Sequence, residues 1–116
     1  MAPLWWGGMP AKMQGVIDRT FLPGLTFSYH ENDPWWDKLL DGRTGDVVVT
    51  ADTPGFFLKF MYSNAHKHRI TKQILGFTGV KVTKYTYFAT AKTAKEAKIK
   101  TWIDKAYNLG ADAGRR

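Results

Sequence analysis

The sequence predicts an open α/β fold with the element order helix, strand, helix, strand, helix. Residues 46–51 form a short β-branched run without polar alternation, which is typical of a parallel strand covered on both faces. A helical pattern follows and leads to a second β-branched and aromatic run at residues 80–88. Strand, helix and strand in this order predict a right-handed βαβ unit, the module of open α/β sheets.

Composition fits this class and excludes several others. The chain has 116 residues, enough for one small domain, and its 44% hydrophobic and 15% aromatic content predicts a packed core. The absence of Cys excludes disulfides and thiolate metal sites. No stretch approaches the roughly 20 apolar residues of a membrane span, and no secretory leader is visible at the N-terminus. We therefore expect a soluble cytoplasmic protein.

The net charge of +7 is compatible with a nucleic acid or another anionic partner. The basic residues are spread thinly between Lys59 and Lys105, without a dense block. This spacing favours a solvated basic face, so nucleic-acid binding is not expected to be the main function. A non-catalytic basic α/β module that binds an anionic partner stays open as the alternative function, and its binding would depend steeply on salt.

The first helix is expected over residues 10–22. Pro10 suits the first helical position, because its missing N–H has no partner there, and apolar residues recur at helical spacing from Met13 to Phe21. Residues 23–45 then form a long excursion in which turn formers alternate with aromatic residues. A loop of this length is usually functional or a partner surface.

The strand at residues 46–51 precedes a second helical region over residues 56–79. Ser63-Asn64 supplies a break or a cap within it, and Phe56 and Phe57 are expected in the core. The strand at 46–51 can pair with the strand at 80–88 on one side only. Its other edge faces nothing that this chain supplies, and because a bare apolar edge is a liability, we expect another element there.

The last helix is expected behind a capping box formed by Thr93 and Glu96. An apolar stripe follows, and Gly110 is the expected C-terminal stop. Residues 1–110 therefore make up the expected domain, and residues 111–116 a flexible tail that nothing holds.

Four segments resemble the flavin-dependent NAD(P)H:quinone oxidoreductases, in the order in which that family has them. Residues 3–11 read PLWWGGMPA, and residues 15–24 read GVIDRTFLPG. Residues 49–54 (VTADTP) and 74–80 (ILGFTGV) match later parts of the family. The resemblance covers nearly the whole chain.

This resemblance implies a flavodoxin-like fold, a doubly wound parallel sheet of which this chain is the C-terminal portion. It implies hydride transfer from NADH or NADPH to FMN or FAD, and on to a quinone-type small molecule. The family's N-terminal strands and flavin phosphate loop have no counterpart here, so a truncated chain of this kind would hold flavin weakly and could be inactive alone. The resemblance also implies a homodimer, or a partner that supplies the missing N-terminal half.

By the same resemblance, Trp5, Trp6, Gly7 and Gly8 match the loop that runs along the isoalloxazine edge of the flavin. Glycines suit such a loop, because without a Cβ the backbone N–H groups can approach the ring closely. No catalytic residue is assigned by the resemblance.

Asp52 and Thr53 match a second flavin-facing loop at the carboxyl end of a strand, where ligands of open α/β sheets bind. For Asp52 a turn-capping role stays equally open. Pro54 departs from a Gly-Gly pair of several relatives, since it has no N–H to donate. Phe27 and Tyr29 match the aromatic positions that line the nicotinamide and quinone pocket.

The histidines predict no metal site. His66 and His68 are two residues apart, so on a helix they point in different directions, and no acidic cluster joins them. Tyr62, His66 and His68 lie near the Tyr/His pair that assists hydride transfer in some relatives, but they do not fall into register with it.

Overall fold

Three parallel strands form the central sheet of the computed structural model, which describes the whole chain, residues 1–116. β4 (Thr44–Thr50) lies in the middle, between β1 (Ala2–Pro3) and β5 (Lys81–Phe88). β4 and β5 are the two predicted strands, paired in parallel along their whole length. The βαβ unit predicted from the sequence is therefore confirmed.

β1 corrects the expectation that the second edge of β4 faces nothing in this chain. Ala2 lies opposite Val49 in parallel register, and the N–H of Leu4 donates to the carbonyl oxygen of Thr50 at 2.8 Å. Two residues are too few to display the period of a strand, so the sequence pattern could not predict this pairing. Pro3 fits an edge strand, because it has no N–H to contribute to a ladder.

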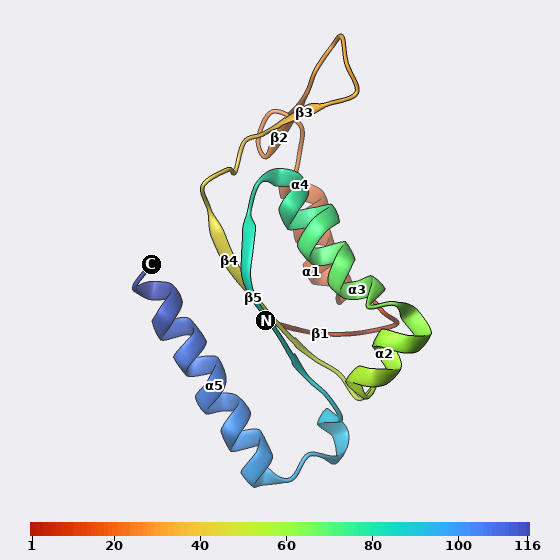
Figure 1. Cartoon of the computed structure of the whole chain (residues 1–116), viewed down its shortest axis with the longest axis vertical. Coiled ribbons are helices and arrows are strands. Elements are labelled where there is room, and N and C mark those ends of the chain that lie inside the picture. Colours follow the sequence, from red (N-terminus) through yellow and green to blue (C-terminus); the bar gives the residue numbers. More distant parts are fainter.

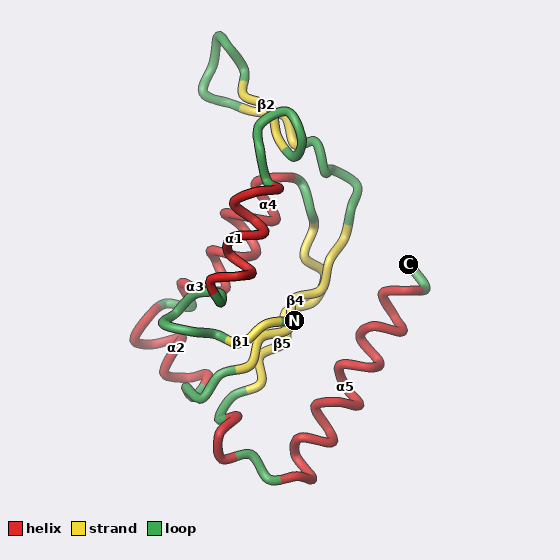
Figure 2. The backbone as a smooth tube through the Cα atoms, turned by 180° about the vertical axis from the view of Figure 1, so that it is seen from behind, coloured by secondary structure: helices red, strands yellow, loops and turns green.

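Helices cover both faces of the sheet (Figure 1). The helices between β1 and β5 lie on one side and the C-terminal helix lies on the other, as the view from behind also shows (Figure 2). The helices on the first side are α1 (Ala11–Thr20), α2 (Gly55–Tyr62), α3 (Ala65–His68) and α4 (Gly76–Thr78), and the C-terminal helix is α5 (Glu96–Gly114). This is the layer arrangement expected of an open α/β sheet.

The predicted break after the first apolar helix is confirmed. Ser63 and Asn64 both have left-handed backbone conformations, with φ of 49° and 53°, and they separate α2 from α3. A π-helical segment (Arg69–Leu75) then joins α3 to α4. Wide turns of this kind are rare and occur frequently at functional sites.

The predicted excursion at residues 23–45 contains a hairpin that the sequence did not predict. β2 (Phe27–Tyr29) and β3 (Trp36–Lys38) pair antiparallel, and the hairpin projects beyond the sheet at the end where β4 begins (Figure 1). Strands of three residues are too short to display an alternating pattern.

The start of α5 differs from the predicted capping box. The helix begins after Lys95 with no side-chain cap, while Thr93 belongs to a short 3₁₀ turn (Ala91–Thr93). The Thr93 hydroxyl donates to the carbonyl oxygen of Thr90 at 3.5 Å, so it is not available to the helix. The predicted capping box therefore does not form, because its Thr93 is part of the turn that connects β5 to α5.

Gly110 does not end α5, which continues to Gly114. A tertiary contact extends the helix past Gly110: Asp112 pairs with Lys84 of β5 at 3.1 Å and holds the last turns of α5 against the sheet. Arg116 pairs with Asp46 of β4 at 2.6 Å, and this guanidinium holds the pKa of the Asp46 carboxyl below its usual range. The expectation that nothing holds residues 111–116 is therefore wrong.

The core is thin for a chain of this size. Nine of 116 residues are buried, and none of them belongs to α1. The accessible surface is 8404 Å², against about 6,400 Å² for a compact monomer of this mass. The radius of gyration is 16.0 Å, against about 13 Å for a compact domain of this length.

Much of the extra surface is apolar and lies on α2. Phe56 is 65% exposed and Phe57 39%, so the expectation that both are core residues is wrong. Every position of this short helix except Gly55 and Lys59 carries an apolar or aromatic side chain, yet only Leu58 is buried. A helix of eight residues can turn only one face to the sheet, so its other apolar side chains stay outside.

Candidate functional site

Two loops predicted to face the flavin begin at neighbouring points of one sheet edge. β1 and β4 are parallel and end side by side, with Leu4 hydrogen-bonded to Thr50. The Trp5–Gly8 loop continues from β1 and the Ala51–Pro54 loop from β4. The carboxyl edge of the strands is where open α/β sheets bind their ligands.

The Trp5–Gly8 loop is a tight two-residue turn. Trp5 and Gly8 exchange two backbone hydrogen bonds, each at 2.9 Å. The two residues between them, Trp6 and Gly7, have positive φ of 50° and 74°, the signature of a type I′ turn. The N–H groups of Trp6 and Gly7 donate to no acceptor in the chain, so the turn presents two free donors at its tip.

The surroundings of this turn leave room for a planar ligand. A side chain at Gly7 would meet nothing within 4 Å. Trp6 is fully exposed, and Trp5 is 60% exposed. Large aromatic side chains held outside the core on a rigid turn offer a flat apolar surface beside the two free N–H donors.

The second loop is fixed by bonds to β5 and to the turn that follows it. The Asp52 carboxylate accepts a hydrogen bond from the N–H of Lys92 at 2.5 Å. Of the two roles that the sequence left open for Asp52, flavin contact and turn capping, this bond corresponds to turn capping. The Tyr87 hydroxyl donates to the carbonyl oxygen of Thr53 at 2.6 Å, and burial raises the pKa of Tyr87. Pro54 is the residue before α2. An N–H at this position has no partner within the helix, so its absence in proline costs the helix no hydrogen bond.

Phe27 and Tyr29 lie beyond the amino end of the β4 and β5 strands, whereas the Trp5–Gly8 turn lies at the carboxyl end of the sheet (Figure 1). The Phe27 ring packs edge-on against Phe77 at 5.0 Å and Tyr29 at 5.2 Å. Phe77 precedes the start of β5, so this aromatic cluster sits at the amino end of the strands. One copy of the chain therefore does not bring Phe27 and Tyr29 together with the turn.

The hairpin tip carries a histidine between two carboxylates. The imidazole of His30 contacts Asp33 at 2.9 Å and Asp37 at 3.1 Å. The hydrogen bond to Asp37, followed by that to Asp33, raises the pKa of His30 above its usual 6.5. The pairing therefore stabilises the hairpin fully below pH 6.5, and this contribution is lost as the pH rises through the folded-state pKa.

We expect Asp37→Asn to lower the pKa of His30 toward its usual value, because it removes the largest cause of the shift. Proton NMR titration of the His30 ring measures this directly. Glu31→Gln is the matched control, since Glu31 makes no contact with the ring, and it should leave the titration unchanged. Equal midpoints for the parent chain and Asp37→Asn would contradict the pairing.

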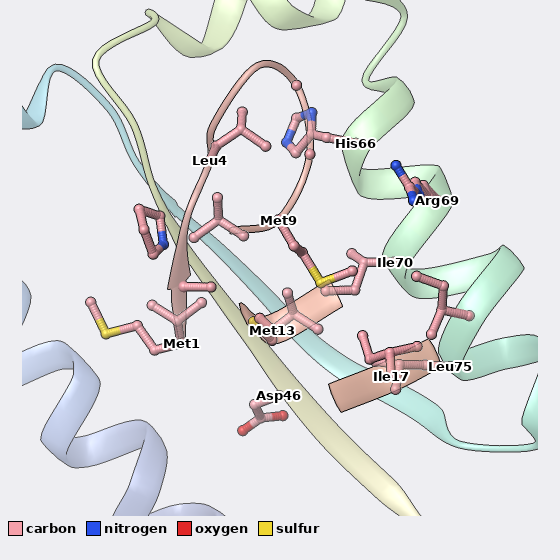
Figure 3. Close-up of a pocket in the computed structure, with 18 of the residues that line it drawn as sticks. Met1, Leu4, Met9, Met13, Ile17, Asp46, His66, Arg69, Ile70 and Leu75 are labelled. Atoms are coloured by element: carbon pink, nitrogen blue, oxygen red, sulfur yellow. The ribbon is translucent and has the colours of Figure 1, made fainter. Parts of the chain in front are cut away.

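Behind the turn, an apolar cavity of about 240 Å³ separates α1 from the sheet and the π-helical segment. Met13 and Ile17 of α1, with Ile70 and Leu75 of the π-helical segment, line it (Figure 3). The cavity marks where α1 packs loosely on the sheet. Gly7 and Gly8 of the turn also line it, so this apolar cavity adjoins the candidate site.

Two residues that the sequence analysis did not assign to the site lie against the turn. His66 and Arg69 come from α3 and the π-helical segment and stand beside the Trp5–Gly8 loop (Figure 3). Arg69 donates to the Gln14 side chain of α1 at 3.0 Å. Their spacing of three residues places both on one helix face, which is the only signal in the sequence that could have grouped them.

Comparisons with known proteins agree with the fold. A model of a family described as having a flavodoxin-like fold matches residues 1–109. An FMN-dependent NADH:quinone oxidoreductase from Albidiferax ferrireducens is 31% identical over 86 residues, which are 68% of this chain and 38% of that protein.

Two solved structures have the same fold. The crystal structure of Smu.1420 from Streptococcus mutans superposes with a TM-score of 0.78 at 26% identity, over 92% of this chain and 55% of that one. A candidate quinone reductase from Klebsiella pneumoniae gives a TM-score of 0.71 at 23% identity, over 87% and 43%. The chain thus spans between about two fifths and just over half of the length of these relatives. Among its helices, none has the length and apolar character that crossing a bilayer demands.

Proposed function

The chain belongs to the flavodoxin-like fold family, and we propose that it is the ring-binding part of an FMN-dependent quinone oxidoreductase. The observation that carries this proposal is the Trp5–Gly8 turn, which presents two free N–H donors at the carboxyl edge of the sheet. The FMN-dependent relative supports FMN as the flavin and NADH as the donor. The bound flavin would supply the hydride chemistry.

The residues present fit such a ring. The N–H groups of Trp6 and Gly7 would donate to polar atoms on its edge, and the open space beside Gly7 lets the ring approach. α1 begins at Ala11, just behind the turn, and the positive end of its dipole favours negative charge on the reduced ring. Asp52 and Thr53 would form the second loop at the flavin edge. Asp52 would contribute by holding the shape of this loop through its hydrogen bond with the N–H of Lys92.

We also propose that the active protein is a homodimer. Phe27 and Tyr29, the residues proposed to line the quinone and nicotinamide pocket, are far from the turn in one copy, so a second copy would have to bring its hairpin to the ring. Tyr29 is 62% exposed and would make the contact, whereas Phe27 is buried and would support the Tyr29 ring from behind. The apolar surface of α2 and the accessible area of 8404 Å² support a missing partner. Further strands beside β1, carrying a loop for the flavin phosphate, would extend the sheet in the same way.

The test is NADH oxidation by the purified chain with added FMN and a soluble benzoquinone. We expect the chain to bind FMN weakly by itself and to turn over once strands that carry a flavin phosphate loop are supplied. We expect Trp6→Ala to weaken FMN binding about five- to tenfold, because a stacked aromatic pair contributes roughly 1 kcal/mol. Tyr107→Ala is the control, because it removes another exposed aromatic side chain, 76% accessible, from α5, and FMN binding should be unchanged. A chain that binds no FMN and oxidises no NADH, alone or joined to added strands that carry a flavin phosphate loop, would overturn the proposal.

A further inference from the structure

A second cavity of about 370 Å³ opens beside the Trp5–Gly8 turn, and its wall is basic and polar. Its size lies at the lower end of the range of about 300–1,000 Å³ that is usual for ligand pockets. No Asp or Glu lines it. The lining residues are Gly7, Ala65, His66, His68, Arg69 and Gln73.

Arg69 is a fixed cation without a counter-charge. Its Nη2 donates to the Oε1 of Gln14 at 3.0 Å, which orients the guanidinium, and no carboxylate pairs with it. Its Nη1 reaches the backbone of the turn, 3.6 Å from where a Cβ on Gly8 would lie. The remaining N–H donors of a held guanidinium form a fork that matches an oxyanion in two-point contact.

The imidazole of His66 forms another part of the cavity wall. Its Nε2 is buried and has no hydrogen-bond partner. The ring is held between Tyr85 and Tyr87, with centroids at 6.0 and 5.8 Å, so it cannot easily turn to solvent. Because this nitrogen has almost no accessible surface, it does not open into the cavity, and His66 contributes only the rest of its ring to the wall.

Arg69 is the one permanently charged residue that lines the cavity, and no carboxylate opposes it there. Burial and the neighbouring charges of Lys67 and His68 hold the pKa of His66 below its usual value. His66 is therefore neutral near pH 7 and adds no charge of its own to the cavity wall. The free N–H of Gly7 lies on the same wall and supplies another donor.

We propose that this cavity is a subsite that binds a phosphate group of the pyridine nucleotide donor. Arg69 supplies the charge, the free N–H of Gly7 and the side-chain amide of Gln73 supply neutral donors, and the neutral ring of His66 forms part of the wall. The proposal rests on the proposed function, because Gly7 belongs to both the ring-binding turn and the cavity. A nucleotide with its nicotinamide at the ring would place its phosphates beside that shared residue.

Phosphorus NMR and calorimetric titration of the full chain with inorganic pyrophosphate test this directly. We expect saturable binding that is at least about tenfold weaker in Arg69→Gln, which removes a charge-assisted contact. Lys72→Gln is the matched control, because it removes a positive charge from the same helical segment outside the cavity, and it should bind like the parent chain. No saturable binding, or equal loss in both variants, would overturn the subsite.

Competition identifies the source of the phosphate and needs no variant that might fail to fold. We expect NADH to displace pyrophosphate from the parent chain, whereas pyrophosphate that stays bound in saturating NADH would identify a free-phosphate site and overturn the proposal. FMN binding is followed separately by flavin fluorescence. Loss of FMN binding refutes the proposed function, whereas absent pyrophosphate binding with FMN still bound refutes the subsite alone.

Discussion

We expect Gly79→Ala to lower the free energy of unfolding by about 3 kcal/mol or more. Gly79 has φ of 105°, which side chains rarely adopt. A Cβ there would lie 2.7 Å from the N of Asp41 and 2.9 Å from its Cα. These are backbone atoms of the segment that joins the hairpin to β4, so neither strain nor clash can be relieved by turning a side chain.

Urea unfolding followed by circular dichroism measures this change. Gly110→Ala is the matched control, because Gly110 lies inside α5 with open space around it. It should raise the free energy of unfolding by roughly 0.5–1 kcal/mol, since alanine restricts the unfolded chain and favours the helix. A Gly79→Ala chain as stable as the parent would contradict the close approach of these two backbone segments.

The second large effect is expected at the turn itself. Gly7→Val should weaken FMN binding at least about tenfold, because a β-branched residue strongly disfavours the φ of 74° that holds the two N–H donors in place. A Cβ at this position meets nothing within 4 Å and the turn lies at the surface, so the fold should survive and the loss should be confined to binding. Fluorescence titration of FMN measures the affinity, and circular dichroism checks the fold.

Gly7→Asn separates the backbone effect from the added side chain. Asn adopts left-handed conformations far more readily than Val, so this variant should keep the turn and most of the FMN affinity. If Val and Asn weaken FMN binding equally, bulk at position 7 and not the turn geometry controls binding. If neither changes it, the ring is bound elsewhere.

The sequence predicted the βαβ core because its signal is local. The β-branched run in β4 and the mixed β-branched and aromatic run in β5 each specify a strand without reference to the rest of the chain. The features missed from the pattern depend on contacts distant in sequence. β1 is a strand only because β4 lies beside it, and α5 passes Gly110 while Lys84 and Asp46 bind its last residues.

The candidate site likewise has a part encoded in consecutive residues and a part that depends on contacts distant in sequence. The Trp5–Gly8 loop was found by resemblance, and its glycines and aromatics carry that signal in consecutive residues. Arg69 and His66 reach the turn from a helix about 60 residues further along, and no short motif encodes such a meeting. The proposed roles of Phe27 and Tyr29 need a second copy, so a single chain cannot display them.

Amide NMR of the full chain during titration with FMN tests the central claim most directly. The account predicts that the largest shift changes fall on the N–H groups of Trp6 and Gly7, with smaller changes at Asp52 and Thr53 on the neighbouring loop. Changes centred on the hairpin, on α5 or spread without a maximum at the turn would contradict the assignment of this turn as the seat of the flavin ring.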